Sequence, residues 1–196
     1  MVKSRDVKIN GLFSVLLLIL MLLYPFLVYQ HIEEVSPAWF AGGLLIALVL
    51  RFAFVAKVKH ISDWLMLGVA SVFFISVMLY ESKQLLKFYP VLMNLGMGLI
   101  FIISLKGKQS LIETFAKAGG KTPPPQARGY LRSLTLMWGV LLILNAAISA
   151  YTAWFTSLST WAFYNGLLSY LLIASFAAGE WVYRGHYKKK HNIVDE

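Results

Sequence analysis

Six long apolar runs, separated by short polar segments, cover most of the chain. Each run has about the length that an α-helix needs to cross a hydrocarbon core about 30 Å thick at 1.5 Å per residue. The pattern therefore predicts an all-α membrane protein, a six-transmembrane-helix bundle that forms a single domain. The expected spans are residues 9–29, 37–56, 64–80, 88–105, 134–155 and 161–183.

The basic residues indicate the orientation of these spans. Fifteen of the 18 Lys and Arg residues lie before the first span, after the second, between the fourth and fifth, or in the tail 184–196. Alternating spans place all four of these segments on one side of the membrane. Only Lys83 and Lys87 fall in a connection on the other side. Because basic connections stay in the cytoplasm, both termini are expected to be cytoplasmic.

Composition narrows the class of protein further. A hydrophobic fraction of 59% with 14% charged residues excludes an ordinary soluble domain. The basic residues that give the chain its net charge of +9 flank the spans. The expected partners are therefore the lipid bilayer and its anionic headgroups, and no nucleic acid is expected. The chain has no cysteine, and it shows no zinc-ligand spacing, nucleophile elbow or phosphate loop. No cofactor, metal or catalytic residue is predicted, and an enzyme is the less expected class.

The one long connection, residues 106–133, predicts a short helix on the cytoplasmic surface. Ser110 and Glu113 fit a capping box, apolar residues follow at helical spacing, and Gly119-Gly120 can end the helix. Prolines at 123–125 then predict an extended segment. The alternative is an unstructured loop. The candidate lipid- or partner-docking residues of this loop are Lys106, Lys108, Glu113, Phe115, Lys117 and Lys121.

Polar residues inside the apolar runs form a second candidate site, because polar groups in lipid are costly and usually face protein or a cavity. Arg51 and Glu180 lie at similar depths and could pair. Alternatively, Arg51 extends to the headgroups and Glu180 pairs with Arg184 on its own helix. The amides either bond across helix interfaces or line a substrate path. The residues of this set are Arg51, Asn94, Asn145, Asn165 and Glu180.

Small residues predict where helices approach one another closely. Ala146 and Ala150 are one turn apart on the fifth run, as are Ser175 and Gly179 on the sixth, and the fourth carries Gly98. Such spacing lets helix backbones pack in lipid, although it also arises by chance in an Ala-rich helix. The uncharged segment 156–160 predicts a tight hairpin between the last two spans.

A string of motifs over residues 88–184 resembles a known family. It comprises Tyr89-Pro90-Val91 with Asn94, Ser104-Leu105, Leu111–Ala116, the prolines, Tyr130 with Arg132, Thr135 with Trp138, Asn145, Trp161 with Tyr164-Asn165-Gly166 and Tyr170, and Gly179-Glu180 with Arg184. The chain resembles an uncharacterised bacterial membrane protein family encoded beside aryl-polyene and unusual fatty-acid synthesis genes, members of which are sometimes mislabelled as a gyrase subunit. It is also similar, more distantly, to the intracellular septation protein A family.

The resemblance implies a bacterial inner-membrane location and a role in making envelope products, and it supplies no catalytic residues. The first hypothesis is a non-enzymatic protein that assists synthesis or export of an acyl or polyene-type envelope component. Its basic loop would dock acyl carrier protein, which is typically acidic, or soluble synthesis enzymes. The alternatives are a small transporter or flippase for a hydrophobic or amphipathic substrate, and a membrane-embedded acyltransferase or hydrolase.

Overall fold

The computed structural model describes residues 19, 23–54, 61–120 and 122–190, and every regular element in that part of the chain is helical. The expected first span, residues 9–29, lies mostly outside the described residues. The chain divides into two compact units. The first unit comprises Met1–Tyr89 and Ser149–Leu167, and the second comprises Pro90–Ile148 and Leu168–Glu196.

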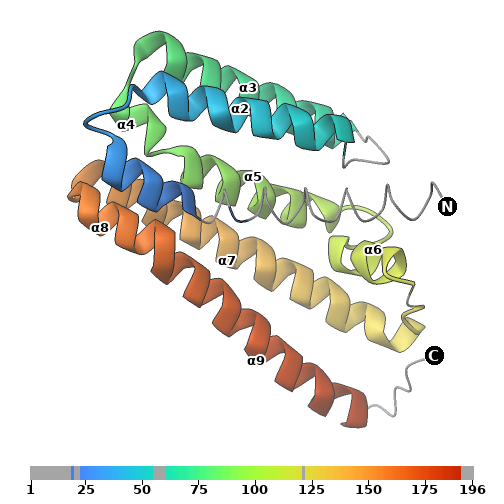
Figure 1. Cartoon of the computed structure of the whole chain (residues 1–196). Helices are drawn as coiled ribbons and strands as arrows, with labels where there is room; N and C mark the ends of the chain where they lie inside the picture. Colours follow the sequence, from blue (N-terminus) through green and yellow to red (C-terminus); the bar gives the residue numbers. More distant parts are fainter. Residues whose placement is uncertain (1–18, 20–22, 55–60, 121, 191–196) are drawn as a thin grey trace, which may run out of the picture. The chain divides into compact units, whose positions relative to one another are not determined.

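In the first unit, helices α2 (Pro37–Phe54) and α3 (Ile61–Tyr80) lie side by side (Figure 1). Pro37 suits the first turn of α2, where its missing N–H has no intrahelical partner anyway. Helix α3 ends at Tyr80, directly before Glu81, whose φ of 46° lies in the left-handed region that cannot continue a helix. Ser82 then begins the short helix α4 (Lys83–Leu86), because its Oγ accepts from the Leu85 N–H at 3.1 Å.

Side chains from distant parts of the first unit hold α4 in place. The Tyr24 hydroxyl donates to the Leu86 carbonyl at 3.0 Å, and the Trp161 indole N–H donates to the Lys87 carbonyl at 3.0 Å. Gln84 in turn donates to the Ala153 carbonyl at 2.8 Å. The last carbonyls of a helix need such partners where water is excluded, so a helix of four residues persists here through tertiary hydrogen bonds.

The predicted hairpin near residues 156–160 is present. Helix α7 (Arg128–Phe155) ends directly before it, and α8 (Leu158–Phe163) follows. Ser157 caps α8 by accepting from the Thr160 N–H at 3.2 Å. A π-helical turn, Tyr164–Leu168, then leads into α9 (Ser169–Lys190).

The second unit contains α5 (Tyr89–Ser104) from Pro90 onward, α6 (Leu111–Ala118), a 3₁₀ turn at Pro125–Ala127, most of α7, and α9. Helices α5 and α7 approach so closely that a Cβ on Gly139 would lie 3.3 Å from the Gly98 carbonyl oxygen. The predicted close contact at Gly98 is therefore present. At Gly179 nothing lies within 4 Å of the Cβ position, so the close contact predicted there is absent among the described residues.

The bounds of two helices differ from the prediction. Helix α7 begins at Arg128 instead of residue 134, and α9 continues to Lys190 instead of ending at 183. The charged residues at these ends lowered the hydropathy of the pattern but do not interrupt backbone hydrogen bonding, because Arg and Lys are good helix formers. The loop between α5 and α7 is accordingly shorter than residues 106–133.

Candidate functional site

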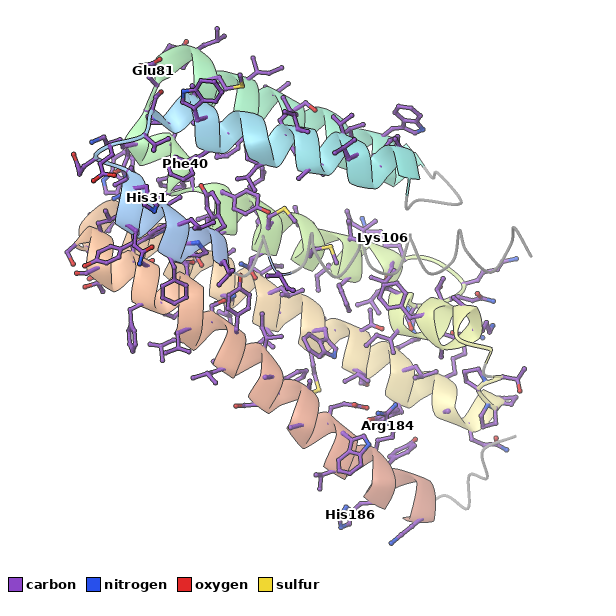
Figure 2. The ribbon with its side chains drawn as sticks, viewed as in Figure 1. His31, Phe40, Glu81, Lys106, Arg184 and His186 are labelled. Atoms are coloured by element: carbon purple, nitrogen blue, oxygen red, sulfur yellow. The ribbon has the colours of Figure 1, made fainter. Side chains whose placement is uncertain are left out.

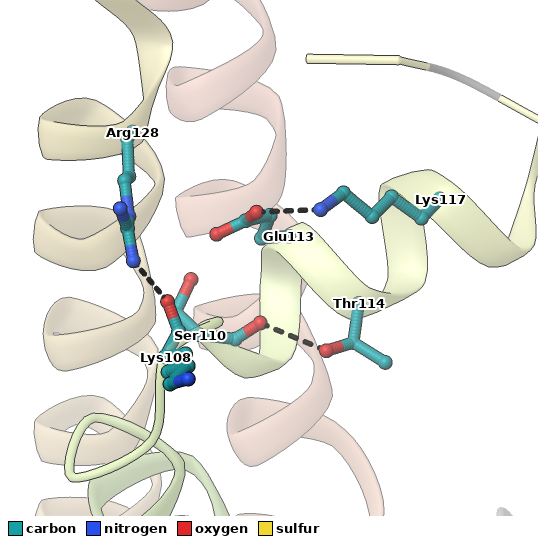
Figure 3. Close-up of polar contacts among 6 residues, drawn as sticks. All are labelled: Lys108, Ser110, Glu113, Thr114, Lys117 and Arg128. Atoms are coloured by element: carbon teal, nitrogen blue, oxygen red, sulfur yellow. Dashed lines mark hydrogen bonds and ion pairs between the residues drawn. The ribbon is translucent and has the colours of Figure 1, made fainter. Parts of the chain in front are cut away.

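Helix α6 lies beside the end of α5 (Figure 1) and confirms the predicted short helix in the long loop. Its first N–H group is capped from α5, since Leu111 N donates to Ser104 Oγ at 3.0 Å. The Ser110 side chain is buried and makes no cap hydrogen bond. The predicted capping box is therefore wrong in its serine half, because the neighbouring helix end supplies the acceptor. The Ser110 carbonyl instead accepts from the Thr114 hydroxyl at 3.1 Å (Figure 3).

Glu113 points from α6 into the second unit and is only 8% exposed. Its Oε1 accepts from the Lys117 ammonium at 2.9 Å (Figure 3). That hydrogen bond holds the pKa of the Glu113 carboxyl below its usual range. Burial opposes the shift, while the charges of Lys117 and Arg128 and the Ser110 backbone N–H add to it. The second oxygen, Oε2, is buried and has no hydrogen-bond partner among the described residues.

The arginines that begin α7 bind the backbone just after α5. Arg128 donates to the Lys108 carbonyl (Figure 3), and Arg132 donates to the carbonyls of Leu105 and Gly107. The two guanidinium groups thus satisfy backbone carbonyls of the loop that follows α5. These two residues hold the loop against α7, a role that the sequence pattern did not reveal.

The lysines of the loop are placed differently from one another. Lys117 is ion-paired with Glu113. Lys106, at the end of α5 (Figure 2), and Lys108 are exposed, and neither side chain forms an ion pair within the described ranges. Phe115 is 55% exposed, with its ring edge-on to that of Phe101 at 6.4 Å. Lys121 lies outside the described residues.

A cavity of about 310 Å³ lies between α6, the proline segment 123–125 and the start of α7. Three cationic side chains and one carboxylate line it, together with the three prolines. We call this the loop cavity, and its charged residues are Lys108, Glu113, Lys117 and Arg128.

The amides of the second unit form a hydrogen-bonded group. Asn145 is fully buried on α7, and its Nδ2 donates to Asn94 Oδ1 at 2.9 Å and to Ser169 Oγ at 2.8 Å. Asn94 also donates to the Pro90 carbonyl at 2.8 Å. The group links α5, α7 and α9, and Ser169 was not predicted. Such bonds are a structural device in lipid, contributing about 0.6 to 2 kcal/mol each.

Asn165 belongs to a separate group in the first unit. Its Nδ2 donates to the Trp161 carbonyl at 3.0 Å and to Thr152 Oγ1 at 3.2 Å. The Asn165 Oδ1 atom is buried and has no partner among the described residues. The same is true of Ser149 Oγ on α7. Asn165 lies in the π-helical turn, a feature often found at functional sites.

Glu180 bonds to two residues of the second unit. The Tyr130 hydroxyl donates to its Oε1 at 2.8 Å, and Arg184 Nε lies 3.4 Å from the same oxygen (Figure 2 labels Arg184). The predicted alternative of a local Glu180–Arg184 contact is therefore present. The side chain of Arg51 lies outside the described part of the chain, so an Arg51–Glu180 pair stays a prediction. Tyr130 stacks on Tyr187 at 4.6 Å, a contact between helices that sequence spacing cannot show.

We expect the Glu113–Lys117 pair to stabilise the protein only above acidic pH. The folded pKa of Glu113 lies below its ordinary value of 4.5, so its contribution is present above that value and is lost as pH falls through the folded pKa. Glu113→Gln should lower the free energy of unfolding by about 0.5 to 1 kcal/mol at pH 7. Melting in one detergent from pH 7 to pH 3 measures this. The difference between wild type and variant should shrink toward acid, and a constant difference would contradict it.

The described helices define the class of this protein. Three helical segments, Lys83–Ser104, Pro125–Phe155 and Leu158–Tyr187, are long and apolar enough to cross a membrane, and two shorter apolar helices, Pro37–Leu50 and Leu67–Tyr80, accompany them. Large apolar side chains such as Trp39 and Leu79, 78% and 77% exposed, lie on helix surfaces, as expected where lipid is the solvent. The chain is a helical membrane protein. No protein-family model, curated protein or solved structure matches it.

Proposed function

We propose that this protein is a non-enzymatic integral protein of a bacterial inner membrane that assists synthesis or export of an acyl or polyene-type envelope component. It has six spans and both termini in the cytoplasm, an orientation supported by the distribution of basic residues along the sequence. The observation that carries the proposal is the exposed basic surface beside α6. There, Lys106 and Lys108 present ammonium groups that no described acid neutralises.

An acidic soluble partner is the occupant that this surface favours. Long-range attraction between a basic patch and an acidic protein raises the rate of association and selects the partner. Acyl carrier protein, or a soluble acyl or polyene synthesis enzyme, fits this requirement. Helix α6 is fixed to α5 through Ser104 and the loop is fixed to α7 through Arg128 and Arg132, so the patch is preorganised and loses little conformational freedom on binding.

The test is binding of acyl carrier protein to the purified protein in nanodiscs at low salt. The double variant Lys106→Glu, Lys108→Glu should weaken binding by about tenfold or more, mainly through the association rate and its salt dependence. Lys83→Glu is the control, because Lys83 is an exposed lysine of the first unit whose ammonium donates to Glu33 Oε2 at 2.6 Å. A reporter fused after Gly120 checks that the loop is cytoplasmic. Unchanged binding in the double variant would refute docking at this surface.

A small transporter or flippase is the second candidate. The buried atoms Asn165 Oδ1 and Ser149 Oγ, both without partners among the described residues, favour it, because a passing polar group could bond to them. Asn165→Leu should then abolish export of the product from cells while leaving acyl carrier protein binding unchanged. If the lysine double variant loses export of the product while Asn165→Leu retains it, the result supports docking instead.

A further inference from the structure

Docking of a protein partner on the basic surface beside α6 does not require the volume or the charged lining of the loop cavity. Its volume of about 310 Å³ is at the small end of ligand pockets, which run from about 300 to 1,000 Å³. Its charged lining, with Lys108, Lys117 and Arg128 against Glu113, does not suit an acyl chain. A small polar group with excess negative charge suits it better.

The cationic side chains that line the cavity have capacity for an anion. Arg128 uses one N–H group on the Lys108 carbonyl, and a guanidinium has five such donors in a planar fork that matches phosphate oxygens. The Lys108 ammonium has no ion-pair partner within the described ranges. A phosphate group placed between these two side chains would accept charge-assisted hydrogen bonds from both.

The carboxylate of Glu113 needs a donor that the described residues do not supply. Lys117 bonds to Oε1, whereas Oε2 is buried without a partner (Figure 3). A buried acceptor without a hydrogen bond is costly, and native structures contain few of them. A ligand that carries an N–H or O–H donor a few atoms from its phosphate would satisfy this oxygen.

We propose that the loop cavity binds a phosphate ester that carries a nearby primary ammonium or hydroxyl group. Arg128 and Lys108 hold the phosphate, and Glu113 Oε2 accepts from the ammonium or hydroxyl. The cavity is lined by the loop after the candidate span Lys83–Ser104 and by the first residues of the candidate span Pro125–Phe155, where lipid headgroups would meet it. The headgroups of phosphatidylethanolamine and phosphatidylglycerol have this chemistry, and so do soluble esters such as phosphoethanolamine. Phosphatidylcholine, whose quaternary nitrogen has no hydrogen to donate, does not.

The test measures binding of three lipids with identical acyl chains to the full-length protein in detergent by native mass spectrometry. The wild type should bind phosphatidylethanolamine and phosphatidylglycerol about tenfold more tightly than phosphatidylcholine, the value of one charge-assisted hydrogen bond. Glu113→Leu should remove this preference while phosphate binding persists. Lys108→Gln should weaken the binding of all three lipids by the same factor. We prefer the variant Lys108→Gln to a substitution of Arg128, because Arg128 also holds the loop backbone.

Lys106→Gln is the matched control, because Lys106 is an exposed lysine of the same loop that does not line the cavity. Equal affinity of the wild type for the three lipids would overturn the proposal. It would also be overturned if Lys106→Gln and Lys108→Gln weakened lipid binding to the same extent. Competition by soluble phosphoethanolamine separates the two sources of the ester. Tighter binding of phosphoethanolamine than of the lipid identifies a free ester as the ligand, and weaker binding identifies the lipid headgroup. The measurement contains no partner protein, so its outcome is independent of acyl carrier protein docking.

Discussion

Trp161→Ala should lower the free energy of unfolding by about 3 to 5 kcal/mol, the range for truncating a fully buried aromatic residue. The Trp161 side chain is 0% exposed, and its indole N–H bonds to the Lys87 carbonyl at 3.0 Å. Truncation therefore leaves a cavity and also leaves a carbonyl at the end of α4 without its donor. Unfolding in mixed micelles, followed by circular dichroism, measures the loss.

Two further variants separate packing from hydrogen bonding at this position. Trp161→Phe keeps an aromatic ring but removes the donor and the smaller ring of the indole, so we expect a smaller loss of about 1 to 3 kcal/mol. Trp39→Ala removes an indole that is 78% exposed, and its effect should stay within about 0.5 kcal/mol. A Trp161→Ala variant no less stable than Trp39→Ala would show that α4 is not held through this residue.

Gly139→Leu should destabilise the contact between α5 and α7 by about 1 to 3 kcal/mol or more, the cost of overpacking a close-packed interior. Even a Cβ at this position would lie 2.6 Å from Ile102 Cδ1 and 3.3 Å from the Gly98 carbonyl oxygen. The Ile102 methyl can rotate away, but the backbone of α5 cannot. A leucine therefore forces the two helices apart, and the melting temperature in detergent should fall.

Gly129 provides the matched control on the same helix, since nothing lies within 4 Å of its Cβ position. Gly129→Leu should leave stability unchanged or raise it, because leucine favours a helix over glycine by up to about 1 kcal/mol. Equal melting temperatures for Gly139→Leu and Gly129→Leu would contradict the close approach of α5 and α7.

Local sequence signals determined the elements of this protein. Hydropathy located the apolar parts of the described long helices, since a run of apolar residues is itself the requirement for crossing lipid, but it missed the charged ends of α7 and α9. The bounds of α6, Leu111–Ala118, follow from apolar spacing and from Gly119-Gly120, where Gly120 has a φ of 80°. The hairpin at residues 156–160 is likewise local, because Ser157 caps the helix that follows it.

Tertiary structure alone decided which polar groups meet. Asn145 bonds to Asn94, 51 residues away, and Tyr130 bonds to Glu180, 50 residues away. Helices that are apolar on all sides carry no periodic polar face, so the pattern does not tell which side of each helix faces its neighbour. The same reason hid the contact at Gly139 and the cap that Ser104 provides for α6. The sequence thus determined the helices and the basic loop, whereas the rotation and register of the helices produced the loop cavity.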